Sequence, residues 1–384
     1  MPKKIKISID ATSLYIRQIR SAPRGSASNF RLEVQFCCLV KRGAMKQVKT
    51  LSATDASLAA FRAVGEPVLV RGLVADWPIV AAALGGSEKL AARLSANASD
   101  AQLSYASGDP EFLGRFHYTA DGRQLNFTRH QASLGQFLQI LLDEMKGDLP
   151  RSLAAQAMPV HLCIPGFAHV HTMPLISPLV MPRMWICNRT EVAAHNDELE
   201  NLACVVAGRR RFTLFPPEAI GDLYLGPYEL TPGGTPISMV HVSAPDLIRY
   251  PRYAKAAKVA LVTEMEPGDV LYIPYHWYHH VGALDPINIL VNYWWDPARQ
   301  DLGSPWDALL HGIIALRELP PDQRRAWKAV FDHYVFLTNG DPGEHLAPEM
   351  RGVLAQSDPA ATARLKRDLI NNLSEDGQKS GPFA

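Results

Sequence analysis

The sequence predicts a mainly β domain with flanking helices, followed by a helical C-terminal segment. Short apolar runs between turn residues are typical of strands, and the clearest lie at 202–207, 212–215, 270–273 and 287–295. Apolar residues at helical spacing recur in the last 80 residues. A chain of 384 residues is long enough for one large domain and an appendage.

The composition along the chain divides it into three parts. Residues 1–44 contain nine lysines or arginines against two acids and show no clear period, which is typical of a disordered tail, a transit peptide or a start codon placed too early. Met45 is therefore our candidate for the native start. Residues 45–300 hold the main domain, and residues 301–384 hold the helical segment.

The first half of the main domain has alternating helix and strand patterns. The predicted elements are a capped helix that follows Asp55 and ends at Gly65, a strand at 67–72, a turn at 76–78, a helix at 85–97, strands at 103–107 and 115–120, and a helix at 133–146. The apolar stripe of the last helix indicates core packing and no cofactor. Residues 151–183 show no clear pattern.

The pair His195 and Asp197 is the first chemically informative feature. Side chains alternate along a strand, so residues two apart project to one face and can reach one metal ion. This pattern alone is common by chance. It gains weight from the two strand-like runs that follow it, which a basic turn at 208–211 separates.

A third ligand is expected from the segment after Pro274, where His276, His279 and His280 compete. If residues 277–281 are extended, His279 lies on the opposite face from the other two histidines, and we predict it as the ligand. Two imidazoles and one carboxylate that leave other positions open form the facial triad of non-haem Fe(II) oxygenases. A second metal site at His161, His169 and His171 is not expected, because their spacing fits no common ligand motif.

The end of the chain is predicted to be helical. One helix starts at Ser304 and Pro305, a second covers 322–336, and a third starts at Asp358. Their apolar residues predict packing on the outside of the β domain or a dimer interface.

Charge, cysteine content and hydropathy limit the functional classes. A net charge of +1 gives no reason to expect nucleic acid or an anionic membrane as a partner, and no apolar stretch approaches the length of a membrane span. Five cysteines without a C-x-x-C pair indicate a reducing compartment, and we expect the cytoplasm. Cys163, Cys187 and Cys204 are predicted to be buried apolar residues, whereas Cys37 and Cys38 lie in the basic extension.

Several motifs together resemble one known family. These are GEPVLVRGLVADWP at 65–78, AHND at 194–197, GRRRFTLFPP at 208–217, GDVLYIPYHWYHHV at 268–281 and VNYWW at 291–295. In this order they resemble the cupin-like branch of the Jumonji-C (JmjC) Fe(II)/2-oxoglutarate oxygenases, which includes the asparaginyl hydroxylase that inhibits hypoxia-inducible factor. The resemblance covers about residues 50–300.

The resemblance implies a fold, a reaction and cofactors. The fold would be a double-stranded β-helix (jelly-roll, cupin/JmjC), with C-terminal helices that form a homodimer. Fe(II) would be held by His195, Asp197 and His279, with 2-oxoglutarate and O2 as cosubstrates. The reaction would be a hydroxylation. The substrate would be a protein side chain, a peptide or a small molecule.

The resemblance also implies cosubstrate contacts, with two departures. Arg210 occupies the position of the family's lysine, and an arginine can still bind a carboxylate with two parallel hydrogen bonds. Asn292 matches a position near the cosubstrate and iron, whereas residues 293–295 are expected to pack the barrel. The family's hydroxyl donor, three residues before the first histidine, is Val192 here. Thr190 lies nearby and is included as a cosubstrate candidate, although its position does not match.

Two alternatives remain open on the sequence. The chain could be a non-catalytic cupin-like protein that binds metal or acts as a scaffold, and the departures at Arg210 and Val192 favour this reading. It could also be an oxygenase that acts on RNA, a free amino acid or another small metabolite, although the neutral net charge argues against RNA.

Overall fold

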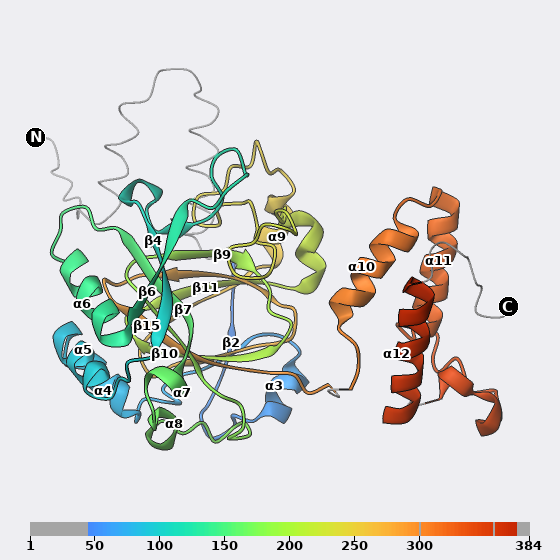
Figure 1. Cartoon of the computed structure of the whole chain (residues 1–384), viewed down its shortest axis with the longest axis horizontal. Coiled ribbons are helices and arrows are strands. Elements are labelled where there is room, and N and C mark those ends of the chain that lie inside the picture. The colour runs from blue at the N-terminus through green and yellow to red at the C-terminus, as the bar shows by residue number, and fades with distance from the viewer. Residues whose placement is uncertain (1–44, 299–300, 356–357, 375–384) are drawn as a thin grey trace, which may run out of the picture. The chain divides into compact units, whose positions relative to one another are not determined.

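The computed structural model describes residues 45–298, 301–355 and 358–374 (Figure 1). The predictions for residues 1–44, including Cys37 and Cys38, fall outside these ranges. The chain divides into two compact units, Met1–Asp296 and Pro297–Ala384. Each unit is described by itself below.

The first unit contains two β-sheets, which bring together strands that are distant in the sequence. The six-stranded sheet has, in spatial order, β1 (Lys46–Gln47), β12 (Leu261–Met265), β11 (Arg210–Phe215), β14 (Tyr278–Ala283), β9 (Glu191–His195) and β5 (Arg115–Phe116). The nine-stranded sheet has β2 (Lys49–Leu51), β3 (Val68–Val70), β13 (Val270–Ile273), β10 (Glu200–Ala207), β15 (Asn288–Trp295), β8 (Arg183–Cys187), β7 (Ser152–Pro159), β4 (Gln102–Gly108) and β6 (Phe127–Ser133).

The two sheets face each other across an apolar core. Phe212 and Leu214 of the six-stranded sheet belong to the same buried cluster as Ala203, Leu271 and Leu290 of the nine-stranded sheet. This arrangement is a double-stranded β-helix, or jelly-roll, as predicted. Strand β10 is buried at all eight positions, because one face lines this core and the other packs under helices. Burial on both faces explains its continuous apolar run.

Helices cover the outer face of the nine-stranded sheet (Figure 1). They are α3 (Leu58–Val64), α4 (Pro78–Leu84), α5 (Ser87–Ala96), α6 (Leu134–Glu144), α7 (Val160–Cys163) and α8 (Phe167–Val170). A capping box fixes the start of α6, because the Ser133 hydroxyl accepts from the backbone N–H of Gln136 and the Gln136 side chain accepts from that of Ser133. The remaining short elements are the 3₁₀ turns η1 (Pro110–Phe112) and η2 (Pro217–Asp222) and the helix α9 (Tyr253–Val259).

The second unit is helical. It contains α10 (Pro305–Leu316), α11 (Pro321–Tyr334), η3 (Pro348–Met350), η4 (Gly352–Leu354) and α12 (Pro359–Ser374). The three α-helices start within one residue of the predicted positions, and the Ser304 hydroxyl caps α10 by accepting from the N–H of Trp306. In the described ranges, no helix combines the length and hydropathy that crossing a membrane requires.

Several local predictions were wrong at the level of element boundaries. The first helix is capped by Ser57 and ends at Gly65, as predicted. The strand expected at 115–120, however, is limited to β5, and Pro78, which was expected in a turn, starts α4. Strand β7 lies in the region without a clear pattern, because a bulge interrupts its alternation. The edge strand β6 was also missed, because most of its residues are exposed.

Candidate metal centre

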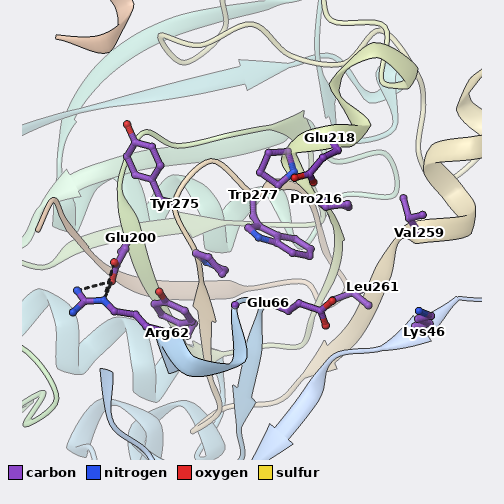
Figure 2. A pocket seen from close by; sticks show the side chains of 14 residues that line it. Lys46, Arg62, Glu66, Glu200, Pro216, Glu218, Val259, Leu261, Tyr275 and Trp277 are labelled. Atoms are coloured by element: carbon purple, nitrogen blue, oxygen red, sulfur yellow. Dashed lines mark hydrogen bonds and ion pairs between the residues drawn. The ribbon is translucent and has the colours of Figure 1, made fainter. Parts of the chain in front are cut away.

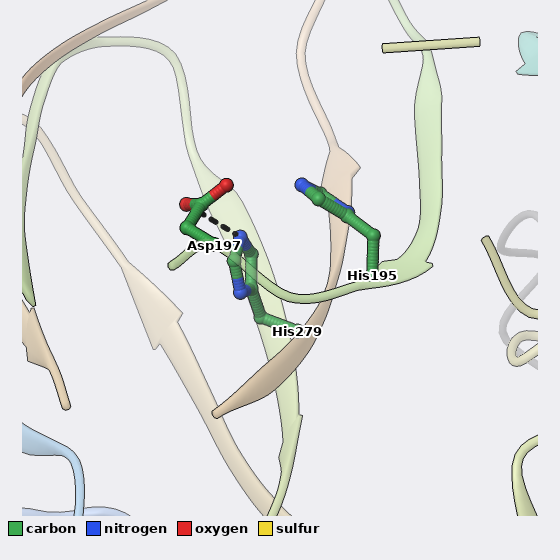
Figure 3. A group of neighbouring side chains, drawn as sticks. All are labelled: His195, Asp197 and His279. Carbon is green, nitrogen blue, oxygen red and sulfur yellow. Dashed lines mark ion pairs between the residues drawn. The ribbon is translucent and has the colours of Figure 1, made fainter. Parts of the chain in front are cut away.

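The three predicted ligands come together at one end of the six-stranded sheet (Figure 3). His195 is the last residue of β9, and it is directly paired with His279 on the neighbouring strand β14. Asp197 lies two residues beyond the end of β9. The prediction that both residues lie on one strand was therefore wrong. The chain after the strand instead turns this carboxylate towards the two imidazoles.

Backbone hydrogen bonds orient both imidazoles. The Nδ1 atom of His195 lies 2.9 Å from the carbonyl oxygen of Ala193, and that of His279 lies 3.1 Å from the carbonyl oxygen of Trp277. An imidazole that donates from Nδ1 to a carbonyl presents the lone pair of Nε2, which is the form that binds a metal. In each case the partner is the residue two positions earlier on the same chain segment.

The distances between the ligand atoms suit a single ion. The Nε2 atom of His279 lies 3.7 Å from Oδ2 of Asp197, and one ligand atom from each residue lies within 4.8 Å of the others. Bonds of about 2 Å to one central ion place neighbouring ligand atoms roughly 3–4 Å apart. In the described part of the chain, this is the one group of three such side chains that converges in this way.

Burial keeps the third ligand neutral. Desolvation, and then the neighbouring His195, lower the pKa of His279 to about 4 against the opposing effect of Asp197. A neutral imidazole is the metal-binding form, so no proton has to be removed near neutral pH. The carboxylate is also oriented, because the indole Nε1 of Trp294 donates to Oδ2 of Asp197 over 3.1 Å.

The two competing histidines have other partners. His276 has a positive φ of 61°, and its Nδ1 accepts from the side-chain amide of Asn196. The Nε2 atom of His280 lies 3.4 Å from a carboxylate oxygen of Glu191. The alternation of β14 therefore separates His279 from His280, as predicted.

An inner cavity of about 40 Å³ adjoins the ligands and contains the predicted cosubstrate residues Arg210 and Asn292. Arg210 is only 3% exposed, and its guanidinium has one hydrogen bond, from Nη2 to the Cys187 sulfur at 3.5 Å. Within the described ranges, its Nε has no partner and no carboxylate pairs with it. A buried guanidinium without an acceptor is costly, so its environment suits an anionic ligand.

Asn292 also has a side-chain donor without a partner among the described residues. Its side-chain oxygen accepts from the indole of Trp185 over 2.9 Å, whereas its Nδ2 has no partner among the described residues. Thr190, by contrast, is buried but lines neither this cavity nor the outer cavity described next. Val192 lines both cavities at the position of the expected hydroxyl donor, so Thr190 does not replace that donor here.

Sequence reasoning missed the role of Trp294, which was expected only to pack the barrel. Asn292 and Trp294 are two residues apart on β15, so they face the same side of the strand. Trp294 contacts Asp197 and lines the inner cavity with Asn292. The spacing from Asn292 was the available signal.

An outer cavity of about 450 Å³ opens beside His195 and Asp197. It shares five residues with the inner cavity: Trp185, Val192, His195, Asp197 and Trp294. Its other walls include Phe116, Arg129, Gln156 and the loop at 231–235. This cavity is large enough to admit a side chain or a small molecule to the metal ligands.

A larger cavity of about 680 Å³ lies around Trp277 and the ion pair between Arg62 and Glu200 (Figure 2). Glu200 is 6% exposed, and its carboxylate accepts a bidentate pair of hydrogen bonds from Arg62. None of the three candidate ligands lines this cavity. We therefore place the chemistry at the smaller cavities, where the unpaired polar atoms and the ligands converge.

His171 and the three described cysteines have structural environments. His171 stacks on Phe167 with ring centroids 3.9 Å apart and accepts from the backbone N–H of Ile79. Both ring nitrogens of His171 are therefore engaged with the backbone, since its Nδ1 also lies 2.9 Å from the carbonyl oxygen of Phe167. Cys163, Cys187 and Cys204 are buried free thiols, as predicted, and burial raises the pKa of Cys163 and Cys204.

Comparison with known proteins agrees with this geometry. A family described as "Cupin-like domain" matches residues 54–301. The chain is similar to human HSPB1-associated protein 1, with 36% identity over 131 residues, which cover 33% of this chain and 26% of that protein. It is also similar to human bifunctional peptidase and (3S)-lysyl hydroxylase JMJD7, with 35% identity over 130 residues, which cover 29% of this chain and 40% of that protein.

A plant protein is similar over a shorter stretch. Lysine-specific demethylase JMJ31 of Arabidopsis thaliana shares 35% identity over 103 residues, which cover 27% of this chain and 18% of that protein. The aligned part spans about a quarter of HSPB1-associated protein 1, so the likeness concerns part of each protein. With the jelly-roll fold and the matching region of 54–301, the chain belongs to the cupin-like domain family, in the JmjC-type group that its motifs predicted.

Proposed function

We propose that this protein is an Fe(II)- and 2-oxoglutarate-dependent oxygenase that hydroxylates a protein side chain or a small molecule. The observation that carries the proposal is the convergence of His195, Asp197 and His279 beside a buried, unpaired Arg210. Two relatives have names that state a lysyl hydroxylase and a demethylase, which supports an oxygenase-type function for this chain.

The donor set fits Fe(II). Two imidazole nitrogens and one carboxylate oxygen bind the ion on one face and leave positions open for other ligands. When bound there, iron would supply the oxidising chemistry, in which 2-oxoglutarate, O2 and a substrate C–H bond give succinate, CO2 and a hydroxylated product. The carbonyls of Ala193 and Trp277 hold the imidazoles in place, and Trp294 holds the carboxylate.

The polar side chains that line the inner cavity support binding of the cosubstrate. The Arg210 guanidinium would bind the distal carboxylate of 2-oxoglutarate, and its Nε–H has no other partner among the described residues. The Nδ2 of Asn292 is a second donor without a partner in the described part of the chain. The side chains of Trp185 and Trp294 line both cavities beside His195 and Asp197.

The alternative is a cupin-like protein without oxygenase activity. It is favoured by Val192, an apolar side chain at the cavity position where the family resemblance implies a hydroxyl donor. A scaffold of this kind would bind metal through the same three residues and would not take up 2-oxoglutarate.

An anaerobic titration distinguishes the two functions. Fe(II) and then 2-oxoglutarate are added under argon, and the weak visible charge-transfer band of the ternary complex is followed. We expect the band to appear in the wild type and to be lost in Arg210→Ala, which should still bind Fe(II). Iron binding without a band in the wild type would favour the scaffold function.

Two further predictions from the sequence remain proposals. We propose a cytoplasmic location, in keeping with three free cysteines in the described ranges. We also propose a homodimer through the C-terminal helices, where Ile314, Tyr334 and Leu369 are among the exposed apolar side chains. Light scattering tests the dimer, and a monomer at micromolar concentration would contradict it.

A further inference from the structure

The outer cavity has one cation on its wall. Of the residues that line it, Asp197 and His195 are metal ligands, and Arg129 is the remaining charged side chain in the described lining. The aromatic and apolar residues Phe116, Trp185 and Ile237 form much of the rest. A substrate that reaches the metal ligands through this cavity therefore passes the guanidinium of Arg129, which is the one charged group of the described lining that does not bind the metal.

Neighbouring groups hold Arg129 in place. It lies on the edge strand β6, and its guanidinium stacks over the Phe127 ring at 5.4 Å from the centroid. Its Nη2 donates to the carbonyl oxygen of Pro232 at 2.5 Å. No carboxylate pairs with it in the described ranges, so its charge and remaining N–H groups are available to an anionic ligand.

A β-bulge presents a second polar group to the same cavity. Between β7 and β8, Ala155 pairs with Ile186 and Met158 pairs with Met184, so Gln156 and Ala157 together oppose Trp185. One extra residue opposite a single partner is a β-bulge, a feature that often redirects side chains near active sites. Gln156, Ala157 and Trp185 all line the outer cavity.

The bulge is strained. Ala157 has a φ of 49°, in the left-handed region that is unfavourable for residues with a Cβ atom. Strain of this kind persists where surrounding structure enforces it and is common at binding sites. The Gln156 carboxamide is half-buried and has no hydrogen-bond partner among the described residues, so it offers both a donor and an acceptor to a ligand.

We propose that Arg129 and Gln156 select the substrate of this site, by binding a carboxylate and a neighbouring amide respectively. This inference rests on the proposed oxygenase function. An acidic residue within a peptide supplies both groups, as does a free N-acylated acidic amino acid. The loop at 231–235, which contains Gly233 and Gly234, completes this wall without bulky side chains.

Binding measurements without turnover test this proposal. The full chain with Fe(II) is kept under argon and incubated with two pools of capped nonapeptides, in which a randomised centre is flanked by glutamates or by lysines. Retained peptides are quantified by mass spectrometry. We expect the wild type to retain the glutamate pool roughly tenfold better, the lower range for a charge-assisted hydrogen bond. Arg129→Glu should reverse this preference.

Two variants separate the roles of the residues. Gln156→Leu should weaken binding of the glutamate pool about fivefold or more while keeping the preference for acid, because a neutral hydrogen bond contributes about 1 kcal/mol. Arg123→Glu is the matched control, since Arg123 is exposed and lines neither cavity, and it should leave the preference unchanged. Competition with N-acetylglutamate amide shows whether a single residue is sufficient or a peptide is required.

The outcomes are distinguishable from failure of the proposed function. Equal binding of both pools by the wild type, or an unchanged preference in Arg129→Glu, would overturn this inference even if the Fe(II)/2-oxoglutarate band forms. A clear, Arg129-dependent preference in a protein that gives no band would support the inference and overturn the oxygenase function.

Discussion

The buried guanidinium of Arg210 leads to a prediction about stability as well as function. Arg210 is 3% exposed, its one hydrogen bond is to a sulfur, which is a weak acceptor, and its Nε has no partner in the described part of the chain. An unsatisfied buried polar group costs about 1–3 kcal/mol. Methionine has a similar length and no charge, so Arg210→Met should stabilise the metal-free protein by roughly this amount.

Thermal unfolding with and without ligand measures both effects. For a domain of this size, 1 kcal/mol shifts the midpoint by roughly 2–4 °C, so we expect the metal-free variant to melt several degrees above the wild type. Fe(II) and 2-oxoglutarate, each at a hundredfold excess over its Kd, should each stabilise the wild type by about 2.7 kcal/mol. In Arg210→Met the part due to 2-oxoglutarate should disappear.

The neighbouring Arg211 provides a matched control on the same strand. Its side chain is 48% exposed and pairs with Glu264 across β11 and β12. Arg211→Met should therefore change stability by less than about 0.5 kcal/mol and should keep the response to 2-oxoglutarate. If metal-free Arg210→Met is less stable than the wild type by more than about 1 kcal/mol, the native structure already satisfies this guanidinium and our reasoning about an anion site is wrong.

Three other predictions concern the turn before β11, the metal environment and pH. Gly208→Ala should lower the free energy of unfolding by roughly 2–4 kcal/mol, because the φ of Gly208 is 66° and an added Cβ would lie 2.4 Å from the Ile287 carbonyl oxygen. In the same denaturation assay, the control Gly135→Ala within α6 should be neutral or stabilising. Trp294→Phe should weaken Fe(II) binding by about 10–100-fold, since it removes the donor to Asp197, and equilibrium titration would show an unchanged Kd if this view is mistaken. Burial, and then the charge of Arg115, lower the pKa of His117 from 6.5 to about 4. The unfolded chain therefore binds more protons between these values, so stability should fall by up to about 1.4 kcal/mol per unit as pH decreases from 6.5 to 4, and His117→Gln should flatten this slope.

The elements that the sequence predicted best are those with a simple burial pattern. Strand β10 is buried on both faces and gives an unbroken apolar run, and α6 has an apolar stripe between clear caps. Strand β6 has mostly exposed residues, so it shows no alternation, and the bulge in β7 shifts its alternation by one residue. Local patterns report burial, so elements that are exposed or irregular escape them.

The three candidate ligands could be predicted from the sequence, whereas the residues around them could not. Alternation along the strand distinguished His279 from His280 as a ligand. The motifs identified His195 and Asp197 as the other two, and the structure places them beside His279. The contact of Trp294 with Asp197 and the polar wall of Arg129 and Gln156 depend on pairing between distant strands and on a bulge. Such relations appear only after the chain is folded, because sequence spacing does not encode register between strands.

The affinity for Fe(II) under argon, measured for the wild type and Asp197→Ala, tests the metal centre most directly. Asp197→Ala removes the single carboxylate among the three ligands, so it should weaken Fe(II) binding by roughly a hundredfold or more. This loss should exceed the 10–100-fold loss expected when a group that only orients a ligand is removed. The fold should be kept, because Asp197 lies beyond the end of β9 and is partly exposed. An unchanged dissociation constant in Asp197→Ala would show that iron binds elsewhere or not through this triad.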